Sequence, residues 1–568
     1  MALFSKNNSE SKKFIVNGKK TITLRKICDE MDITVPAKFD AIKNKVNNNL
    51  TASPKRISKG SFYFILRDKI QLKKEIEGAV KKGAEVIFVD KKEFDAHGLN
   101  ENNYPVVLLD KKIKQIGAVY SKIRLEYPAK AIGIAGKRGK TITKRLIKQI
   151  FGSSYNLFVS GDNANTYLSV ANHIINKLDE NTELFVQELD APTATSMKKS
   201  ARMLKPDVCV FLNSRDYRKS KAESDDRKQF FERIINLDKF SNLDAVEIVN
   251  NDDDEIAAYL FKRDVISFGI DAKNAVNYRA INIMQKDEFL EFDIVEDETN
   301  LIHIKINGVG RQMIYNTLAA FAVGRHYHFS GDKISRALLN YRTTDLNGYF
   351  RKIGGKYIYL DSDEVNEFTI RDIRVLADEI LQGKAQKVFT LIEKNGESKD
   401  ELFYEELKIN GIQNNLEPII FLDGTEDAID DAEDILMKSM DEGDLLVFRG
   451  TENSKISVLI DRLFNTGISL YWKSYNVEDI EIEDEKSKGR LIPELHKAEV
   501  TSINNDDGEI VYIPETIGQI PIYKTGRHLF KDNETIKELH IGKVLKNIGI
   551  GSFYNCSSLV TVTIPSNV

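Results

Sequence analysis

An apolar run followed by apolar residues at helical spacing is the clearest pattern in the chain. Residues 131–135 read Ala-Ile-Gly-Ile-Ala, which predicts a short buried strand. After Thr141 the apolar positions recur as on one face of a helix, at Ile142, Leu146, Ile147 and Ile150. The turn between the predicted strand and the predicted helix is Gly136-Lys137-Arg138-Gly139-Lys140-Thr141.

This strand-to-helix turn has the composition of a phosphate-binding loop. Consecutive backbone N–H groups and the helix N-terminus point at one place, where an anion is stabilised. Lys140 would reach the β- and γ-phosphates of a nucleotide, and the Thr141 hydroxyl would bind Mg²⁺. The longer motif G-x-x-x-x-G-K-[ST] needs a glycine where this chain has Ile134. The alternative is a basic helix start whose glycines serve only the geometry of the turn.

Four short apolar runs separated by helical stretches mark the later part of the chain. Between residues 341 and 475 they read KYIYLD, KVFTLIE, EPIIFLDG and GDLLVFRG. Such alternation predicts a doubly wound, mostly parallel sheet. The fold class that we expect is therefore α/β.

The tail repeats one pattern with a fixed offset. The segments GRHLFKDNETIKELHI and GIGSFYNCSSLVTVTI place apolar residues 23 positions apart: Phe530 and Phe553, Ile536 and Leu559, Leu539 and Val562, Ile541 and Ile564. A period of about 20–29 residues is typical of leucine-rich repeats, whose units bury their apolar face only by stacking. We expect a short solenoid whose last edge either continues in further repeats or pairs with a partner.

Composition narrows the class of protein. A chain of 568 residues should divide into about three to five domains, and 42% hydrophobic with 30% charged residues is typical of a soluble globular protein. A net charge of −4 argues against a general nucleic-acid binder. Three distant cysteines, Cys28, Cys209 and Cys556, form neither a paired-thiol metal motif nor a disulfide framework. With no apolar run long enough for a membrane span, we expect a cytoplasmic protein.

The short form G-x-x-G-K-T, followed by the lysine of TITK, resembles the loop of the Mur ligases. These are ATP-dependent enzymes that add amino acids or dipeptides to a UDP-linked peptidoglycan precursor. The family's usual text is close to I-T-G-x-N-G-K-T-T-T-K; here Ala135 replaces the first threonine. The extra cations Lys137 and Arg138 either tighten nucleotide binding or occupy the pocket themselves. The resemblance implies a catalytic Lys140, Mg²⁺ on Thr141, and ATP bound by Gly136, Gly139, Lys140 and Thr141.

Three later segments follow in the family's order. SGDNANT is similar to its Asn-rich segment, and ELFVQELDAPTATSMKKSARMLKPDVCVFLNS to its strand, acidic turn, helix and second strand. The resemblance implies a Mg²⁺ ligand at Glu188, which ends the first of these strands; the alternative is a solvated strand end. GRQMIYNTLAAFAVG is similar to the G-x-H-N-x-x-N-x-L-A-A helix. It implies that Asn316 faces the adenine of ATP; without the family this is an ordinary amphipathic core helix.

Other positions depart from the family. KYIYLDSDEVNEFTIRDI keeps an ATP-binding acid at Asp361 but lacks the Asn-Pro pair, and Arg449-Gly450-Thr451 replaces Lys-Gly-Ser. The metal-binding histidine expected after FLNS is absent, and Arg218 is nearest by count. Lys228 is the best candidate for the catalytic, carbamylated lysine of many members. Its alternative is a solvated surface lysine.

The two ends of the chain carry further resemblances. KRISKGSFYFIL and AVKKGAEVIFVD are similar to segments of the family's uridine-binding domain, but Ser53-Pro54-Lys55 replaces its D-S-R motif. The tail text IGIGSFYNCSSLVTVTIPSNV resembles BspA-type leucine-rich repeats.

These resemblances imply a three-domain Mur ligase-like architecture with a short repeat solenoid. Residues 1–125 would bind the UDP-linked substrate, and residues 126–340 would form the central ATP-binding domain. Residues 341–475 would form a Rossmann-like third domain. An acidic linker over 476–500 would lead to the repeats at 501–568.

The function implied is ATP-dependent amide-bond formation through an acyl phosphate. The D-alanyl-D-alanine-adding type fits best, with a UDP-linked muropeptide as carboxylate acceptor and an amino acid or dipeptide as amine. The alternatives are a degenerate Mur ligase-like protein that binds ATP and a partner through its repeats, and a ligase with a different acceptor.

Overall fold

The chain folds into two compact units in the computed structural model. The first comprises Met1–Met284, Glu291–Lys305 and Arg311–Tyr341, and the second comprises the remaining residues. The structure describes residues 13–16, 19–47, 49–66, 71–161, 164–193, 195–214, 224–271, 275–296, 300–342, 348–361, 369–382, 386–394, 401–423, 425–450, 459–460, 462–463, 481–483, 487–492, 497–503, 510–513, 516–517, 520–525, 529–530, 533–541, 545, 548 and 552–564. In these ranges no helix is both long and apolar enough to cross a membrane.

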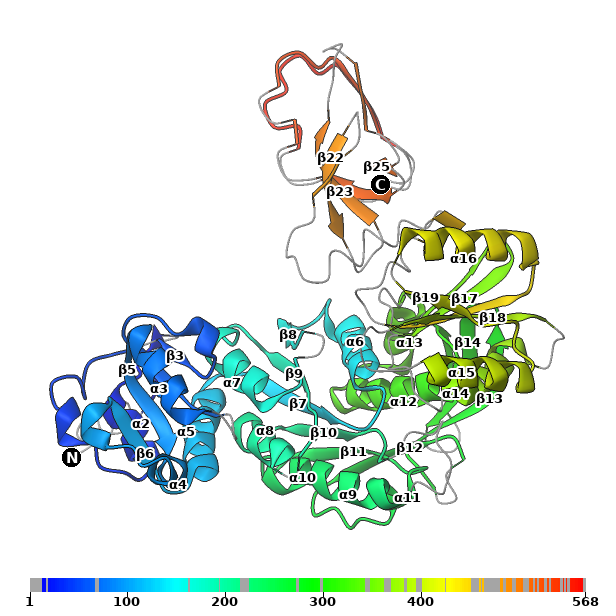
Figure 1. Cartoon of the computed structure of the whole chain (residues 1–568). Coiled ribbons are helices and arrows are strands. Elements are labelled where there is room, and N and C mark those ends of the chain that lie inside the picture. Colours follow the sequence, from blue (N-terminus) through cyan, green and yellow to red (C-terminus); the bar gives the residue numbers. More distant parts are fainter. Residues whose placement is uncertain are drawn as a thin grey trace. The chain divides into compact units, whose positions relative to one another are not determined.

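A four-stranded parallel sheet lies at the start of the first unit (Figure 1). Its strands, in spatial order, are β3 (Leu50–Thr51), β4 (Ser61–Phe64), β5 (Ala84–Asp90) and β6 (Val106–Leu109). The accompanying elements are the hairpin β1 (Ile15–Val16) and β2 (Lys19–Lys20), and helices α2 (Leu24–Glu30), α3 (Leu72–Lys81), α4 (Lys91–Ala96) and α5 (Lys112–Glu126). The position expected for D-S-R lies at a 3₁₀ turn, Pro54–Arg56.

A nine-stranded sheet follows, in the order β15-β14-β13-β12-β11-β10-β7-β9-β8. Its strands are β7 (Lys130–Ala135), β8 (Leu157–Val159), β9 (Leu184–Glu188), β10 (Val208–Phe211), β11 (Val246–Asn250), β12 (Val265–Gly269), β13 (Tyr278–Lys286), β14 (Phe289–Glu296) and β15 (Asn300–Asn307). Its helices are α6 (Lys140–Phe151), α7 (Tyr167–Asn176), α8 (Ser196–Leu204), α9 (Ser224–Ile234), α10 (Asn236–Phe240), α11 (Asp254–Ala257), α12 (Gly310–His326) and α13 (Gly331–Leu339). The predicted strand, turn and helix around residues 131–150 are thereby confirmed.

The turn after β7 leaves this sheet at a topological switch point. Strands β8 and β9 lie on one side of β7, and β10 to β12 lie on the other, all parallel to it. In open parallel α/β sheets, ligands bind beyond the carboxyl ends of the strands at such a point. The fold therefore places the glycine-lysine turn where a ligand site is expected.

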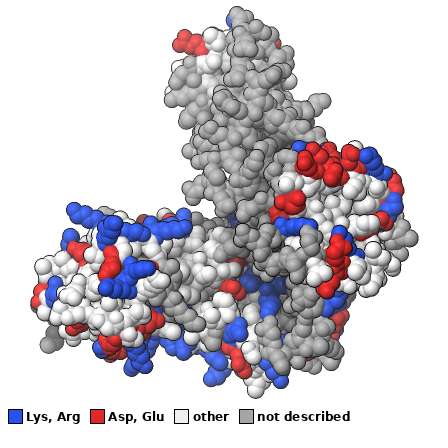
Figure 2. Space-filling model, in the orientation of Figure 1, with Lys and Arg blue, Asp and Glu red and all other residues white. Residues whose placement is uncertain are grey.

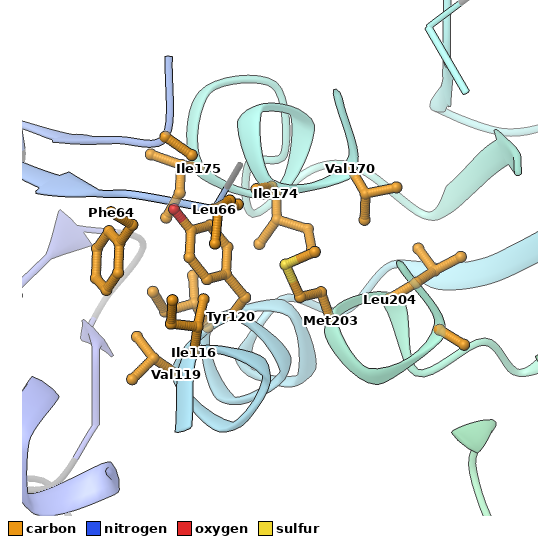
Figure 3. Close-up of a cluster of buried hydrophobic side chains, with 14 of the residues drawn as sticks. Phe64, Leu66, Ile116, Val119, Tyr120, Val170, Ile174, Ile175, Met203 and Leu204 are labelled. Carbon is orange, nitrogen blue, oxygen red and sulfur yellow. The ribbon is translucent and has the colours of Figure 1, made fainter. Parts of the chain in front are cut away.

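The N-terminal sheet and the nine-stranded sheet share one hydrophobic core (Figure 3). Side chains of α5 lie at its centre, with Tyr120 fully buried. The cluster contains Phe64, Leu66, Ile116, Val119 and Tyr120 from the N-terminal part, and Val170, Ile174, Ile175, Met203 and Leu204 from α7 and α8. The expected boundary near residue 125 therefore separates two sheets but not two cores.

Helices α5 and α8 approach closely at a glycine. A Cβ atom on Gly117 would lie only 3.1 Å from the Cβ atom of Arg202. At the end of α5, the buried Arg124 pairs with Asp207, whose carboxylate also accepts the Ala131 N–H at 2.8 Å. These contacts join the end of the N-terminal part directly to the start of β7.

The second unit contains a five-stranded sheet in the order β16-β17-β20-β18-β19. Its strands are β16 (Tyr349–Ile353), β17 (Lys356–Asp361), β18 (Val388–Glu393), β19 (Ile420–Leu422) and β20 (Leu445–Arg449), and all but β16 run parallel. Helix α16 (Glu426–Ser439) covers one face, and α14 (Thr369–Leu381) and α15 (Glu401–Gln413) cover the other. The four apolar runs thus form the parallel strands that we predicted. The acidic residues of α16 are part of the red area on this unit in Figure 2.

The prediction of an acidic linker over residues 476–500 was wrong from residue 481 onward, because strands occur there. Residues 481–503 contain β21 (Glu481–Glu483), β22 (Ser487–Ile492) and β23 (Lys497–Ile503), which form a sheet with β25 (Thr516–Ile517) and β26 (Ile520–Thr525). Ile482, Leu491 and Val500 supply apolar positions along these strands. The net acidity of this segment had obscured its short strand pattern.

A second small sheet carries the repeated tail segments. Strands β24 (Ile510–Ile513), β27 (Glu538–Ile541) and β28 (Thr561–Thr563) run parallel in that order. Leu539 pairs with Val562 in register, and the rings of Phe530 and Phe553 stack with centroids 5.8 Å apart. Both pairs have the 23-residue offset read from the sequence. The stacking predicted for these two pairs is therefore present.

Tyr120 offers a test of the shared core. Its hydroxyl is buried and has no hydrogen-bond partner among the residues that the structure describes. Tyr120→Phe should therefore leave the free energy of unfolding unchanged or raise it by about 1 kcal/mol, because an unsatisfied polar group disappears. Tyr120→Ala should lower it by about 3–5 kcal/mol because a large cavity opens. Urea unfolding that showed equal losses for both variants would contradict this packing.

Candidate nucleotide-binding site

Gly139 gives the turn its shape. Its φ of 86° lies in the left-handed region, and α6 begins at the next residue, Lys140. A Cβ atom on Gly139 would lie 2.1 Å from Asn316 Oδ1 and 2.7 Å from Gln312 Nε2. Backbone angle and space therefore both require glycine here, and α12 lies directly against the turn.

Asn213, just beyond the end of β10, holds the turn by its backbone. Its Oδ1 accepts the Arg138 N–H at 2.9 Å, and its Nδ2 donates to the Arg138 carbonyl at 3.0 Å. The Lys137 N–H donates to the Asn213 carbonyl at 3.1 Å. Gly136 fits tightly beside this strand end, since a Cβ atom there would lie 2.9 Å from Leu212 Cβ. The side chain of Asn213 is fully buried.

The cations of the turn have separate surroundings. Lys140 Nζ donates to the Gly136 carbonyl at 2.8 Å, which keeps the ammonium at the turn. Burial lowers the pKa of Lys140, and the nearby carboxylates of Asp190 and Glu188 oppose this lowering. Lys137 Nζ instead lies 5.0 Å from the centroid of the Phe230 ring on α9.

The two predicted Mg²⁺ ligands lie close together, Thr141 at the start of α6 and Glu188 at the end of β9. Thr141 Oγ1 donates to Glu188 Oε2 at 2.9 Å, and Glu188 is only 1% exposed. The buried Lys144, one helical turn after Lys140, lies 3.1 Å from the same carboxylate oxygen and also donates to the Gly161 carbonyl at 3.0 Å. Glu188 is therefore part of a buried network and is not the solvated strand end of the alternative interpretation.

This oxygen pair fits Mg²⁺, which is usually held by one or two protein oxygens together with substrate phosphates and water. Within the described ranges, no group of three or more His, Cys, Asp or Glu side chains forms a metal cluster. Arg218, nearest to the missing histidine, lies outside those ranges. Lys228 is exposed on α9, and its carbamylation stays a prediction.

The segment similar to the family's Asn-rich stretch lies against the end of β9. Gln187 Nε2 donates to the Ala164 carbonyl at 2.8 Å, and the Asp190 N–H donates to the Asn165 carbonyl at 3.0 Å. Gln187 Oε1 lies 2.8 Å from Nδ1 of His173, whose pKa is lowered by burial. The strand end that carries Glu188 is thus held by the segment before α7 and by α7 itself. Asp162 and Asn163 lie outside the described residues.

Asn316 and Asp361, the remaining predicted ATP-binding residues, belong to different units. Asn316 is fully buried on α12 against Gly139, so the structure brings it to the turn. Asp361 ends β17 in the second unit, and its side chain lies outside the description. Sequence reasoning did not single out Lys144, Asn213 and Gln312 as site residues. A lysine one turn after Lys140 and an asparagine directly after an apolar strand were the available signals.

The ion pair between Lys144 and Glu188 supplies a test of this site. Lys144→Met should lower the free energy of unfolding by about 3–5 kcal/mol, because it leaves a buried carboxylate without its cation. Lys148→Met, on the exposed side of the same helix, should change it by about 1 kcal/mol or less. Equal, small losses for both variants in urea unfolding would show that the ion pair is not buried as described.

Comparison with known proteins gives the family of this region. Residues 134–324 match the model of the Mur ligase middle domain. The UDP-N-acetylmuramoyl-tripeptide–D-alanyl-D-alanine ligase of Bacillus subtilis (strain 168) is 22% identical over 244 residues, which cover 43% of this chain and 51% of that protein. The matched segment thus spans about half the length of this curated relative.

Solved structures extend the similarity beyond the middle domain. MurF from Acinetobacter baumannii has a TM-score of 0.60 at 14% identity, covering 79% of this chain and 99% of that one. The MurF ligase from Thermotoga maritima in complex with ADP has a TM-score of 0.54 at 16% identity, covering 74% and 98%. At this identity the likeness establishes the fold. The match to the Mur ligase family itself is the middle-domain match over residues 134–324.

Proposed function

We propose that the chain is an ATP-dependent carbon–nitrogen ligase that forms an amide bond through an acyl phosphate. The observation that carries this proposal is the 2.9 Å hydrogen bond from the Thr141 hydroxyl to the Glu188 carboxylate. This hydrogen bond lies beside the Gly139-Lys140 turn, at the switch point of a parallel sheet. ATP is the nucleotide of the similar ligases, and Mg²⁺ would be held by Thr141 and Glu188.

The proposed reaction needs placement and charge neutralisation from the protein. A carboxylate oxygen of the acceptor attacks the γ-phosphorus of ATP, which gives an acyl phosphate and releases ADP. The amine then attacks the acyl carbon, inorganic phosphate leaves with the bonding electrons, and the amine loses a proton. Backbone N–H groups of the turn and the Lys140 ammonium would stabilise the phosphates. Mg²⁺ would neutralise charge on the phosphate oxygens during transfer.

For the substrates we propose a UDP-linked muropeptide as acceptor and D-alanyl-D-alanine as amine, in the cytoplasm. The activity for which the Bacillus subtilis relative is named supports this pair. Ser53-Pro54-Lys55 stands where the family has D-S-R, a motif that helps to hold the UDP group of the acceptor. A ligase with a different carboxylate acceptor is the variant of this function that the same nucleotide site would serve.

One observation favours a second function, a binding protein that holds ATP without ligation. The Lys144 ammonium lies 3.1 Å from the oxygen of Glu188 that would face the metal, and a fixed cation there opposes a second cation. Lys228, which the resemblance would make the catalytic, carbamylated lysine, is exposed.

Phosphate release separates these two functions. With ATP, Mg²⁺, UDP-linked tripeptide and D-alanyl-D-alanine, the ligase should release phosphate only when both the acceptor and the amine are present. Lys140→Ala should reduce the rate by at least about a hundredfold, because it removes a preorganised charge at the phosphates. A wild-type rate no higher than that of Lys140→Ala, with ADP binding retained, would select the binding protein.

We further propose that the tail is a BspA-type repeat segment that binds a protein partner by strand addition. Leu539 is 1% exposed because the next repeat packs against it. Val562, which lies 23 residues later at the same position of its repeat, is 37% exposed. Val560 and Ile564 are also exposed on or beside β28. A further repeat, or a partner with a similar repeat, would cover these residues as residues 552–564 cover Leu539.

Hydrogen exchange tests this edge. The Thr561 N–H already donates to the Lys537 carbonyl at 3.1 Å, so the alternate amide of β28, that of Val562, is the one that faces the open edge. The Val562 amide should exchange quickly in the monomer and slowly once a partner or a second copy is bound. Val562→Lys should weaken that association, because it places a charge in the apolar contact. Size-exclusion chromatography showing a monomer whose Val562 amide is already protected would contradict the proposal.

A further inference from the structure

Three amide side chains connect the turn to α12. Asn213 Nδ2 lies 3.5 Å from Gln312 Oε1, and Gln312 Nε2 donates to Asn316 Oδ1 at 2.9 Å. Asn213 and Asn316 are fully buried, and Gln312 is half-buried beside Gly139. All three belong to the first unit.

The direction of this chain of amides is set by the backbone of the turn. The Arg138 N–H can only donate and the Arg138 carbonyl can only accept, so their two bonds fix which end of Asn213 is oxygen and which is nitrogen. Asn213 therefore donates an N–H toward Gln312, so the side-chain oxygen of Gln312 must be the acceptor. Gln312 then presents its own N–H to Asn316, whose oxygen must face it.

The third of these amide side chains, Asn316, has an N–H donor without an acceptor. Asn316 Nδ2 is buried and has no hydrogen-bond acceptor among the residues that the structure describes. A buried donor without an acceptor is uncommon in folded proteins and marks a place where a ligand or water accepts. Asn316 also lies against Gly139, next to the residues proposed to bind the phosphates.

We propose that Gln312 is a positioning residue that makes Asn316 a hydrogen-bond donor to an acceptor atom of the bound nucleotide. This inference rests on the proposed nucleotide site and goes beyond it, because the family pattern has a histidine at position 312. The backbone of the turn sets the orientation of the Asn213 amide, which sets that of Gln312 and, through Gln312, that of Asn316. The same turn that would hold the phosphates thus fixes the polarity of a second contact to the nucleotide.

Calorimetric titration of the full chain with ADP tests this chain of amides. Gln312→Glu has the shape of glutamine but only accepts, so it should turn the Asn316 amide around and weaken ADP binding about tenfold, the loss of one hydrogen bond. Gln312→Met, which is uncharged, should weaken it less, because Asn316 is then free to adopt either orientation. Gln149→Glu, an exposed substitution on α6, controls for the added charge.

A double-mutant cycle with Asn316→Leu decides the mechanism. If Gln312 acts through Asn316, Gln312→Glu should have little further effect once Asn316 is replaced. An undiminished loss in the Asn316→Leu background, or no loss in the wild-type background, would overturn the inference. ADP binding that is absent, or unaffected by Lys140→Ala, would instead overturn the proposed nucleotide site. The two failures are therefore distinguishable.

Discussion

The carboxylate of Glu188 is the interaction on which the site depends. It lies buried at the end of β9 and receives the Thr141 hydroxyl and the Lys144 ammonium on one oxygen. A buried charge is tolerated only when it is paired and hydrogen-bonded, so α6 and β9 must keep their relative positions. Lys144 also bonds the Gly161 carbonyl, which brings the segment after β8 to the same point. Three separate parts of the chain are thereby fixed around the turn.

Much of this arrangement could be predicted from local patterns. The strand at residues 131–135, the following helix and the four strands of the second unit follow from apolar periodicity, which burial enforces directly. The 23-residue offset in the tail was also sufficient to pair Leu539 with Val562. The strands near residue 490 were missed, because their few apolar positions lie among many charges. Residue propensities and charge in that segment favour a linker. Whether strands form there depends on pairing with other strands, which the local sequence does not show.

The polar part of the site was predictable only in part. Lys140, Thr141 and Glu188 follow from the motif and the family resemblance, and the structure places Thr141 against Glu188. Asn213 and Gln312 act on residues far away in the sequence, at separations of 75 and 99 positions for two of their contacts. No local pattern marks such contacts, because they arise when β10, the turn and α12 meet. The ligands of a site are thus easier to find in a sequence than the residues that orient them.

The common core beneath α5 limits how this protein can be rearranged. Phe64 and Leu66 on one side and Val170 and Ile174 on the other belong to a single apolar cluster, with Arg124 and Asp207 joined at its edge. An N-terminal part from another protein, grafted at residue 125, would have to match this surface side chain by side chain. The N-terminal part is therefore not an exchangeable module, and any replacement of it would have to preserve the apolar surface that it shares with α7 and α8.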